Sequence, residues 1–252
     1  MENKPIDRIM NRYFDGEINL DEANKSIVEY LTVRKFDEQT IRRLDRRRDK
    51  GGKKVRTYAE FFRDISIGVR KEHAVFLEWI KYMKSKGFTI KWEKYGTDSV
   101  GLAFVEDNDN RPDYLLSINN SPFFVVDVKT CGTQEINTFK KADLKNYIEH
   151  NALMLVCIGK IDMHDPQLKS FVFYGQKSIK LLNSFDGMIY NEFAPNKPAI
   201  RVSREKELER KKAHISFKKL VEDNLIECIK VTEDMPEFTG PLKALVEHDY
   251  QM

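Results

Sequence analysis

The hydrophobic positions in the first third of the chain recur at helical spacing. Residues 1–56 carry two such stripes, separated by the turn Asp15–Glu17, and a third short helix is predicted between Asp37 and Arg48. A Thr-x-x-Glu capping box at residues 57–60 then marks the start of a longer helix, whose apolar stripe ends at Gly87. This pattern predicts a small helical region followed by a long helix that leads into the rest of the chain.

Beyond this long helix the pattern changes to short apolar runs of strand length. A helix predicted from about Asn137 to His150 separates two of these runs and makes the flanking strands parallel. The order of elements predicts an α/β fold, with a central mixed β-sheet flanked by helices and an N-terminal helical region. Strands are predicted at residues 88–94, 100–105, 114–118, 123–128, 153–158 and 171–174, and further helices at 203–212 and 216–220.

The stretch from Arg111 to Thr130 departs from an ordinary core hairpin. Turn residues at 119–122 separate two strand-like runs, and the second run continues into Asp127 and Lys129. Because side chains alternate along a strand, these two charged residues share one face. Following the ladder back from the turn puts Asp113 beside Asp127 or beside the residue after it. The hairpin is therefore predicted to gather two acids and a lysine.

Two carboxylates opposed on neighbouring strands, with Cβ atoms roughly 4.5–5.5 Å apart, repel each other unless they share a proton or a cation. Carboxylate oxygens in this arrangement suit Mg²⁺ or Mn²⁺, and the adjacent Lys129 can act as an electrophile. The hairpin thus has the outline of a hydrolytic site. The opposing interpretation is that Asp127 and Lys129 simply pair with each other at the surface.

Pro112–Asp113, a spacer, and an apolar strand ending in Asp127–Val128–Lys129 resemble the PD-(D/E)xK nuclease superfamily, over residues 58–175 of this chain. The resemblance implies a restriction-endonuclease-like core in which Asp113, Asp127 and the Val128 carbonyl hold Mg²⁺ or Mn²⁺. It also implies that Lys129 orients the attacking water and offsets charge on the phosphate. DNA would be cut to leave a 5′-phosphate and a 3′-hydroxyl.

The superfamily commonly supplies a further acid from a helix before the sheet. In this chain the apolar stripe skips one position between Val69 and Phe76, and Glu72 fits that position better than its neighbours. Glu78 lies off the stripe, so the resemblance assigns the role to Glu72, which would bind a metal directly or through water. The alternative is a partly exposed acid paired locally with a Lys or Arg. Polar residues that could assist from the helix after the motif are Lys141, Lys145 and Asn146.

Composition is that of a globular chain: 252 residues, 41% hydrophobic and 33% charged. No apolar run approaches a membrane span and no signal-like core is present, so we expect a cytoplasmic protein without a membrane partner. Three scattered cysteines are too few for a disulfide framework or a zinc cluster, which favours a reducing, intracellular setting. The superfamily includes enzymes encoded by phages and mobile elements, and this origin fits the same expectation.

The net charge of +3 hides a basic segment. Between Arg34 and Arg56 there are eleven Lys or Arg against four Asp or Glu, a local charge of 11 − 4 = +7. Such a run can be an ordinary solvated face, but beside a nuclease-like core we expect it to contact phosphates. The helices that carry it could equally form an oligomerisation arm or pack on the core. The candidate nucleic-acid-binding residues are Arg42, Arg43, Arg46, Arg47, Arg48, Lys50, Lys53 and Lys54.

Together these features predict three regions: a basic helical region at 1–56, a nuclease core at 57–192 and a helical extension at 193–252. The predicted activity is a Mg²⁺-dependent endonuclease (deoxyribonuclease) acting on DNA. A homodimer would supply the two active sites that concerted cutting of both strands requires. The alternatives are a non-catalytic nucleic-acid-binding protein on a nuclease fold, against which the clustered charges argue, and a nuclease that acts on RNA.

Overall fold

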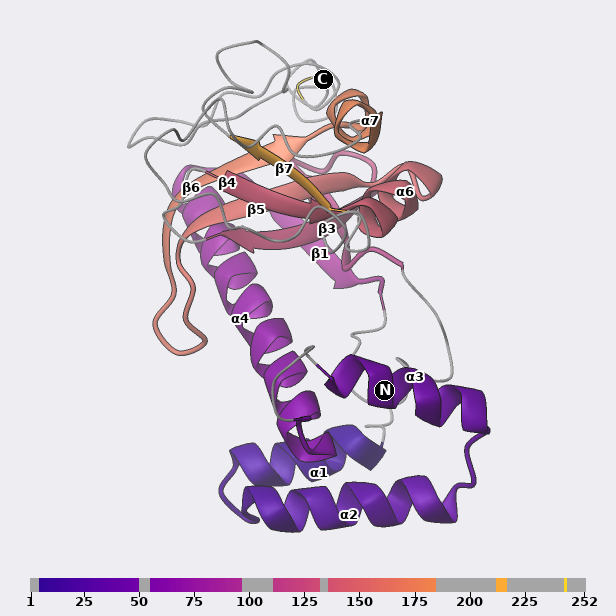
Figure 1. Ribbon diagram of the computed structural model, residues 1–252. Coiled ribbons are helices and arrows are strands. Elements are labelled where there is room, and N and C mark those ends of the chain that lie inside the picture. Colours follow the sequence, from indigo (N-terminus) through magenta and orange to yellow (C-terminus); the bar gives the residue numbers. More distant parts are fainter. Residues whose placement is uncertain are drawn as a thin grey trace, which may run out of the picture. The chain divides into compact units, whose positions relative to one another are not determined.

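The computed structural model describes residues 5–49, 55–96, 111–131, 136–184, 212–216 and 243, and Figure 1 shows its elements along the chain. The chain divides into two compact units. The described residues up to Arg70 belong to the first unit and those from Lys71 onward to the second. This division falls inside helix α4 (Tyr58–Ser85), which contributes to both units. The predicted limits at 57 and 192 stay predictions.

Three short helices and the beginning of α4 form the first unit, as the helical stripes predicted. They are α1 (Pro5–Phe14), α2 (Leu20–Val33) and α3 (Glu38–Arg48). The side chain of Asn19 accepts two backbone N–H groups of the first turn of α2, while Glu22 accepts the Asn19 N–H at 2.8 Å. The shared core consists of Ile6, Met10, Ala23, Ile27, Leu31, Leu44, Ala59, Phe61 and Phe62.

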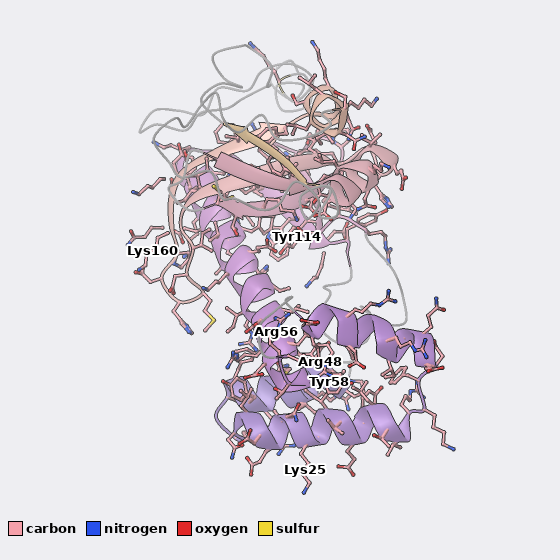
Figure 2. All side chains as sticks on the ribbon, in the orientation of Figure 1. Lys25, Arg48, Arg56, Tyr58, Tyr114 and Lys160 are labelled. Atoms are coloured by element: carbon pink, nitrogen blue, oxygen red, sulfur yellow. The ribbon has the colours of Figure 1, made fainter. Side chains whose placement is uncertain are left out.

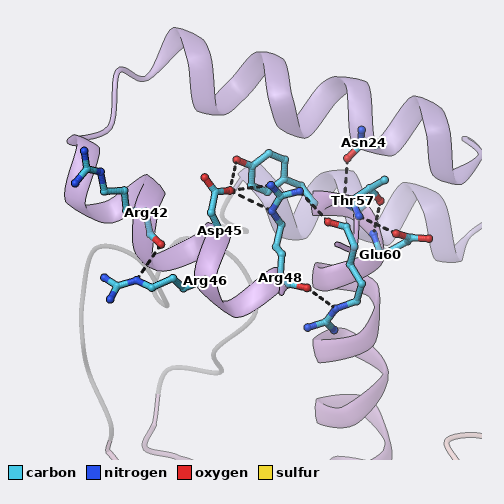
Figure 3. Close-up of polar contacts among 10 residues, drawn as sticks. Asn24, Arg42, Asp45, Arg46, Arg48, Thr57 and Glu60 are labelled. Carbon is cyan, nitrogen blue, oxygen red and sulfur yellow. Dashed lines mark hydrogen bonds and ion pairs between the residues drawn. The ribbon is translucent and has the colours of Figure 1, made fainter. Parts of the chain in front are cut away.

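The end of α3 is fastened to the start of α4 through Arg48 (Figure 3). Its guanidinium donates to Asp45 Oδ1 and to the Arg56 carbonyl, both at 2.8 Å, and its central carbon lies 3.8 Å from the centroid of the Tyr58 ring. The predicted capping box at residues 57–60 is present, with reciprocal hydrogen bonds of 2.7 and 3.1 Å. These contacts fix where α4 begins.

The second unit is built on a five-stranded mixed sheet with the order β1-β2-β3-β5-β6. Neighbouring strands are antiparallel except β3 and β5, which are parallel as predicted. Helix α6 (Lys141–Glu149) lies between β3 and β5 along the chain, and α7 (Gln176–Ser184) follows β6. The strands are β1 (Ile90–Lys94), β2 (Tyr114–Ile118), β3 (Phe124–Cys131), β5 (Leu153–Lys160) and β6 (Gln167–Tyr174).

Each face of this sheet has its own hydrophobic core. On one face, the second part of α4 packs against alternate strand residues: Tyr114, labelled in Figure 2, stacks on Phe76 with ring centroids 4.2 Å apart. On the other face, α6 and α7 cover the intervening positions, where Leu144 and Leu182 share a core with Val156. Because side chains alternate along a strand, successive residues pack against helices on opposite faces of the sheet. The predicted α/β fold, a mixed sheet flanked by helices with an N-terminal helical region, is confirmed.

Three predicted helices are wrong in part. Residues 136–140 are strand β4 (Ile136–Lys140), so helix α6 begins at Lys141 rather than near Asn137. Strand β4 pairs with β7 (Lys212–Ser216) in a separate two-stranded sheet. Residues 212 and 216, predicted to be the end of one helix and the start of the next, are therefore in a strand. The predicted strand at 100–105 and the rest of the two C-terminal helices lie outside the described residues.

Candidate active site

The hairpin register places the two predicted acids side by side. Tyr114 pairs with Val126, so the ladder continued by one residue puts Asp113 opposite Asp127. Asp113 Oδ2 also accepts a hydrogen bond from the N–H of Val128 at 2.8 Å, so the Asp113 side chain binds the β3 backbone at this end of the hairpin. Because the N–H and C=O of one residue in a strand point to the same side, the Val128 carbonyl faces this edge as well.

Asp127 is a buried acid with two close partners. Only 5% of its surface is exposed. Its Oδ2 lies 2.6 Å from Lys129 Nζ and accepts a hydrogen bond from the Tyr147 hydroxyl at 2.7 Å. Asp127 and Lys129 do pair, as the opposing interpretation supposed, but the carboxylate is enclosed rather than at the surface. A buried carboxylate that is paired and hydrogen-bonded can remain charged.

Asp113 is strongly affected by burial and by the second acid. Burial, and after it the charge of Asp127, raises the pKa of Asp113 to about 7. The Lys129 ammonium and the Val128 N–H act in the opposite direction, and the charge of Glu72 adds a smaller increase. Near neutral pH, Asp113 therefore has the two ordinary ways of relieving repulsion between carboxylates: it can hold a proton, or the pair can bind a cation.

Lys129 supplies a permanent positive charge at the same edge. Desolvation lowers its pKa, but the surrounding negative charges, Asp127 first, raise the pKa well above its ordinary value. The side chain is 31% exposed. The ammonium is thus held by Asp127 on a side chain that remains partly exposed.

The structure distinguishes the two candidate acids of α4. Glu72 is partly buried, and its charge contributes to the raised pKa values of Asp113, Tyr114 and Lys129, so it lies within electrostatic reach of the acid pair. Glu78 pairs with Lys81 at 2.9 Å along the helix. The role that the resemblance assigns to Glu72 stays a prediction.

Tyr147 is the contact at this site that the sequence did not single out. We expected it to be an apolar residue of its helix, and its body is indeed buried, with 2% exposed. Its hydroxyl, however, reaches Asp127, while the side chain of Lys141, one of the three polar candidates on α6, lies outside the described residues. Gln176 anchors this end of α6 by donating to the carbonyls of Tyr147 and Ala152. The available signal was a tyrosine on a buried stripe, because a buried phenol needs a partner for its hydroxyl.

The donor set suits a hard divalent cation. Among the residues that the structure describes, no three His, Cys, Asp or Glu side chains form a complete metal cage. Mg²⁺ does not require one, because it usually binds through one or two carboxylates and keeps several waters. Asp113 and Asp127 are the residues that would hold it, with the Val128 carbonyl on the same edge; Glu72 influences this site through its charge.

The predicted basic surface lies in the first unit, and its arginines differ in role. Arg42 is exposed and pairs with Glu38, and Arg46 is exposed and donates to the Arg42 carbonyl. Arg48 is only 18% exposed because it is used in the α3–α4 junction (Figure 3). Arg42 and Arg46 are therefore the better placed for a phosphate. The side chains of Arg43 and Arg47, and the whole of Lys50, Lys53 and Lys54, lie outside the described residues.

This difference predicts unequal effects of two arginine substitutions. Arg48→Ala should lower the free energy of unfolding by about 1–3 kcal/mol, because it removes three hydrogen bonds of a charged donor and the contact with the Tyr58 ring. Arg42→Ala breaks only an exposed pair with Glu38 and should change the free energy of unfolding by less than about 0.5 kcal/mol. Urea unfolding followed by circular dichroism measures both. Equal losses would contradict the structural role of Arg48.

No family model, curated protein or solved structure matches this chain. Within the described residues, no helix combines the length and the apolar character needed to cross a membrane. The resemblance to the nuclease superfamily therefore depends on the motif residues of the sequence.

Proposed function

We propose that this protein is a metal-dependent endonuclease that hydrolyses phosphodiester bonds in DNA. The observation that carries the proposal is the meeting of Asp113, Asp127 and Lys129 at one edge of the β2–β3 hairpin. Placing two acids together in a largely buried position is unfavourable unless something offsets their charge. A bound cation offsets it, and an adjacent lysine is the group that would face a phosphate.

Each residue has a distinct part in the proposed reaction. The chemistry supplied by Mg²⁺, when bound, is Lewis-acid activation of a water and of the scissile phosphate. Asp113 and Asp127 provide its carboxylate ligands, and the Tyr147 hydroxyl fixes the orientation of Asp127. Lys129 remains protonated, so its ammonium can donate to a phosphate oxygen and offset the charge that develops there.

DNA is the preferred substrate for two reasons. The motif resembles a superfamily composed largely of DNA nucleases, and the first unit exposes Arg42 and Arg46 on one helix. Exposed arginines supply sequence-independent affinity for a phosphate backbone. An RNA nuclease would use the same carboxylates and lysine, so cleavage of labelled DNA and RNA of identical sequence decides between these substrates.

The direct test is cleavage of supercoiled plasmid by the purified full-length protein in Mg²⁺, in Mn²⁺ and in EDTA. We expect nicked or linear product with either metal and none with EDTA. The ratio of nicked to linear product reports whether one or both strands are cut, and both would be expected of a homodimer. Tight DNA binding in every condition without cleavage would instead favour the non-catalytic binding protein.

A further inference from the structure

Three side chains outside the proposed chemistry form a cluster in the second unit. The guanidinium carbon of Arg111 lies 5.4 Å from the ring centroid of Tyr95, and the ring of His150 meets the Tyr95 ring edge-on with centroids 6.5 Å apart. Arg111 is exposed, and the two rings are partly exposed. They come from three segments: the residue after β1, the approach to β2 and the residue after α6.

The cluster is joined to Asp113 through the backbone. The N–H groups of Tyr95 and Gly96 both donate to the Asp113 carbonyl, at 2.9 and 3.1 Å. A Cβ at Gly96 would lie 2.7 Å from the carbonyl oxygens of Arg111 and Pro112, a separation that real Cβ atoms essentially never show. The segment after β1 therefore packs closely against the segment that carries Asp113, and this close approach requires glycine at position 96.

A second connection runs through α6 to Asp127. The N–H of His150 donates to the Asn146 carbonyl at 3.0 Å, so the helical turn extends one residue past α6. His150 consequently follows Tyr147 by three residues, on the same side of the helix, and the Tyr147 hydroxyl binds Asp127. The cluster is thus connected to both acids of the candidate active site by separate elements.

We propose that Arg111, supported by Tyr95 and flanked by His150, binds a backbone phosphate of the nucleic-acid strand next to the one that is cleaved. This inference rests on the proposed function. A guanidinium can bind a phosphate in a bidentate manner, and an aromatic ring beneath it limits the positions that it can adopt. Lys129 and a bound cation would contact the phosphate that is cleaved, so a cation beyond them would hold the neighbouring phosphate and keep the strand in register.

The test compares Arg111 with another cation of the same unit. Lys160, labelled in Figure 2, is a matched control because it ends β5, is exposed and pairs with Asp165. Arg111→Ala and Lys160→Ala are each made in the full chain and in an Asp127→Asn background that does not cleave. Affinity for a fluorescein-labelled DNA duplex is measured by anisotropy at several salt concentrations, and KM and kcat are measured with Mg²⁺ in the cleaving background.

For Arg111→Ala we expect DNA affinity to fall about tenfold at low salt and the slope of log affinity against log salt to become shallower by about one. KM should rise while kcat changes little, and Lys160→Ala should leave all these quantities unchanged. Arg111→Lys should restore the charge and part of the affinity but not the bidentate contact. Affinity and salt slope of Arg111→Ala equal to wild type would overturn the inference.

Two further outcomes distinguish a failure of this inference from a failure of the proposed function. If wild type neither binds nor cleaves DNA, the proposed function itself fails. If wild type cleaves but Arg111→Ala is indistinguishable from it, only the phosphate contact fails. Should Arg111→Ala not fold, Arg111→Gln carries the same expectation, and an equal failure of Arg111→Gln to fold would show that the arginine is structural and refute the proposal.

Discussion

Replacing Asp127 with asparagine should reduce the rate of Mg²⁺-dependent DNA cleavage by about 10³-fold or more. Asparagine has the same size and keeps an oxygen that can accept the Tyr147 hydroxyl, so the packing around the hairpin should survive. What it loses is the charge that attracts a cation and fixes the Lys129 ammonium at 2.6 Å. Single-turnover cleavage of a labelled duplex measures the effect on chemistry rather than on product release.

The chain offers a close control for this substitution. Asp165 pairs with Lys160 at 2.6 Å, the same separation as Asp127 and Lys129, but on an exposed part of the second unit. Asp165→Asn therefore removes an aspartate–lysine pair of equal geometry without touching the site, and its cleavage rate should equal that of wild type. Rapid cleavage by correctly folded Asp127→Asn would show that the hairpin is not the catalytic centre.

The core of the candidate site could be predicted from sequence because the relevant physics is local. Strand alternation alone places Asp127 and Lys129 on one face, and a tight turn fixes the register of the hairpin. The one ambiguity, whether Asp113 faces Asp127 or Val128, is resolved by the observed pairing of Tyr114 with Val126. The Val128 N–H nevertheless contacts the Asp113 side chain, so the hairpin brings Asp113 to both residues.

Features that depend on distant segments could not be predicted in this way. Strand β4 pairs with β7, which is far along the chain, and the sequence of residues 136–140 gives no signal of that pairing. Tyr147 has the spacing of a core residue, and its hydroxyl becomes part of the site only when α6 packs on the sheet beside Asp127. Arg48 belongs to a basic run whose residues all have the pattern of surface residues. Its position at the end of α3 nevertheless places it against Tyr58.

The raised pKa of Asp113 leads to a second large effect, this time on stability. In the metal-free protein its pKa is about 7, against an ordinary value of 3.8. Between these values the folded protein holds a proton that the unfolded chain has released, so the free energy of unfolding falls as the pH rises through this window. Above pH 7 the cost of the charged acid pair is present in full, on the order of 2–4 kcal/mol.

Asp113→Asn removes this cost at every pH while retaining an oxygen for the Val128 N–H. In EDTA we therefore expect the variant to melt at a higher temperature than wild type at pH 8, with the difference fading as the pH approaches 4. Asp162→Asn is the control with the opposite sign, because backbone N–H groups of His164 and Asp165 lower the pKa of Asp162 and its charge is favourable. That variant should gain no stability at pH 8.

Adding Mg²⁺ at pH 8 should reverse the order of wild type and Asp113→Asn. A cation that binds only the folded protein raises its melting temperature by mass action, and wild type offers two carboxylates for it whereas the variant offers one. Wild type should therefore gain stability with Mg²⁺ while Asp113→Asn gains little. If Asp113→Asn is no more stable than wild type in EDTA at pH 8, the two carboxylates do not repel each other in the folded protein. If Mg²⁺ stabilises both proteins equally, the ion binds elsewhere and the carboxylate pair is not its site.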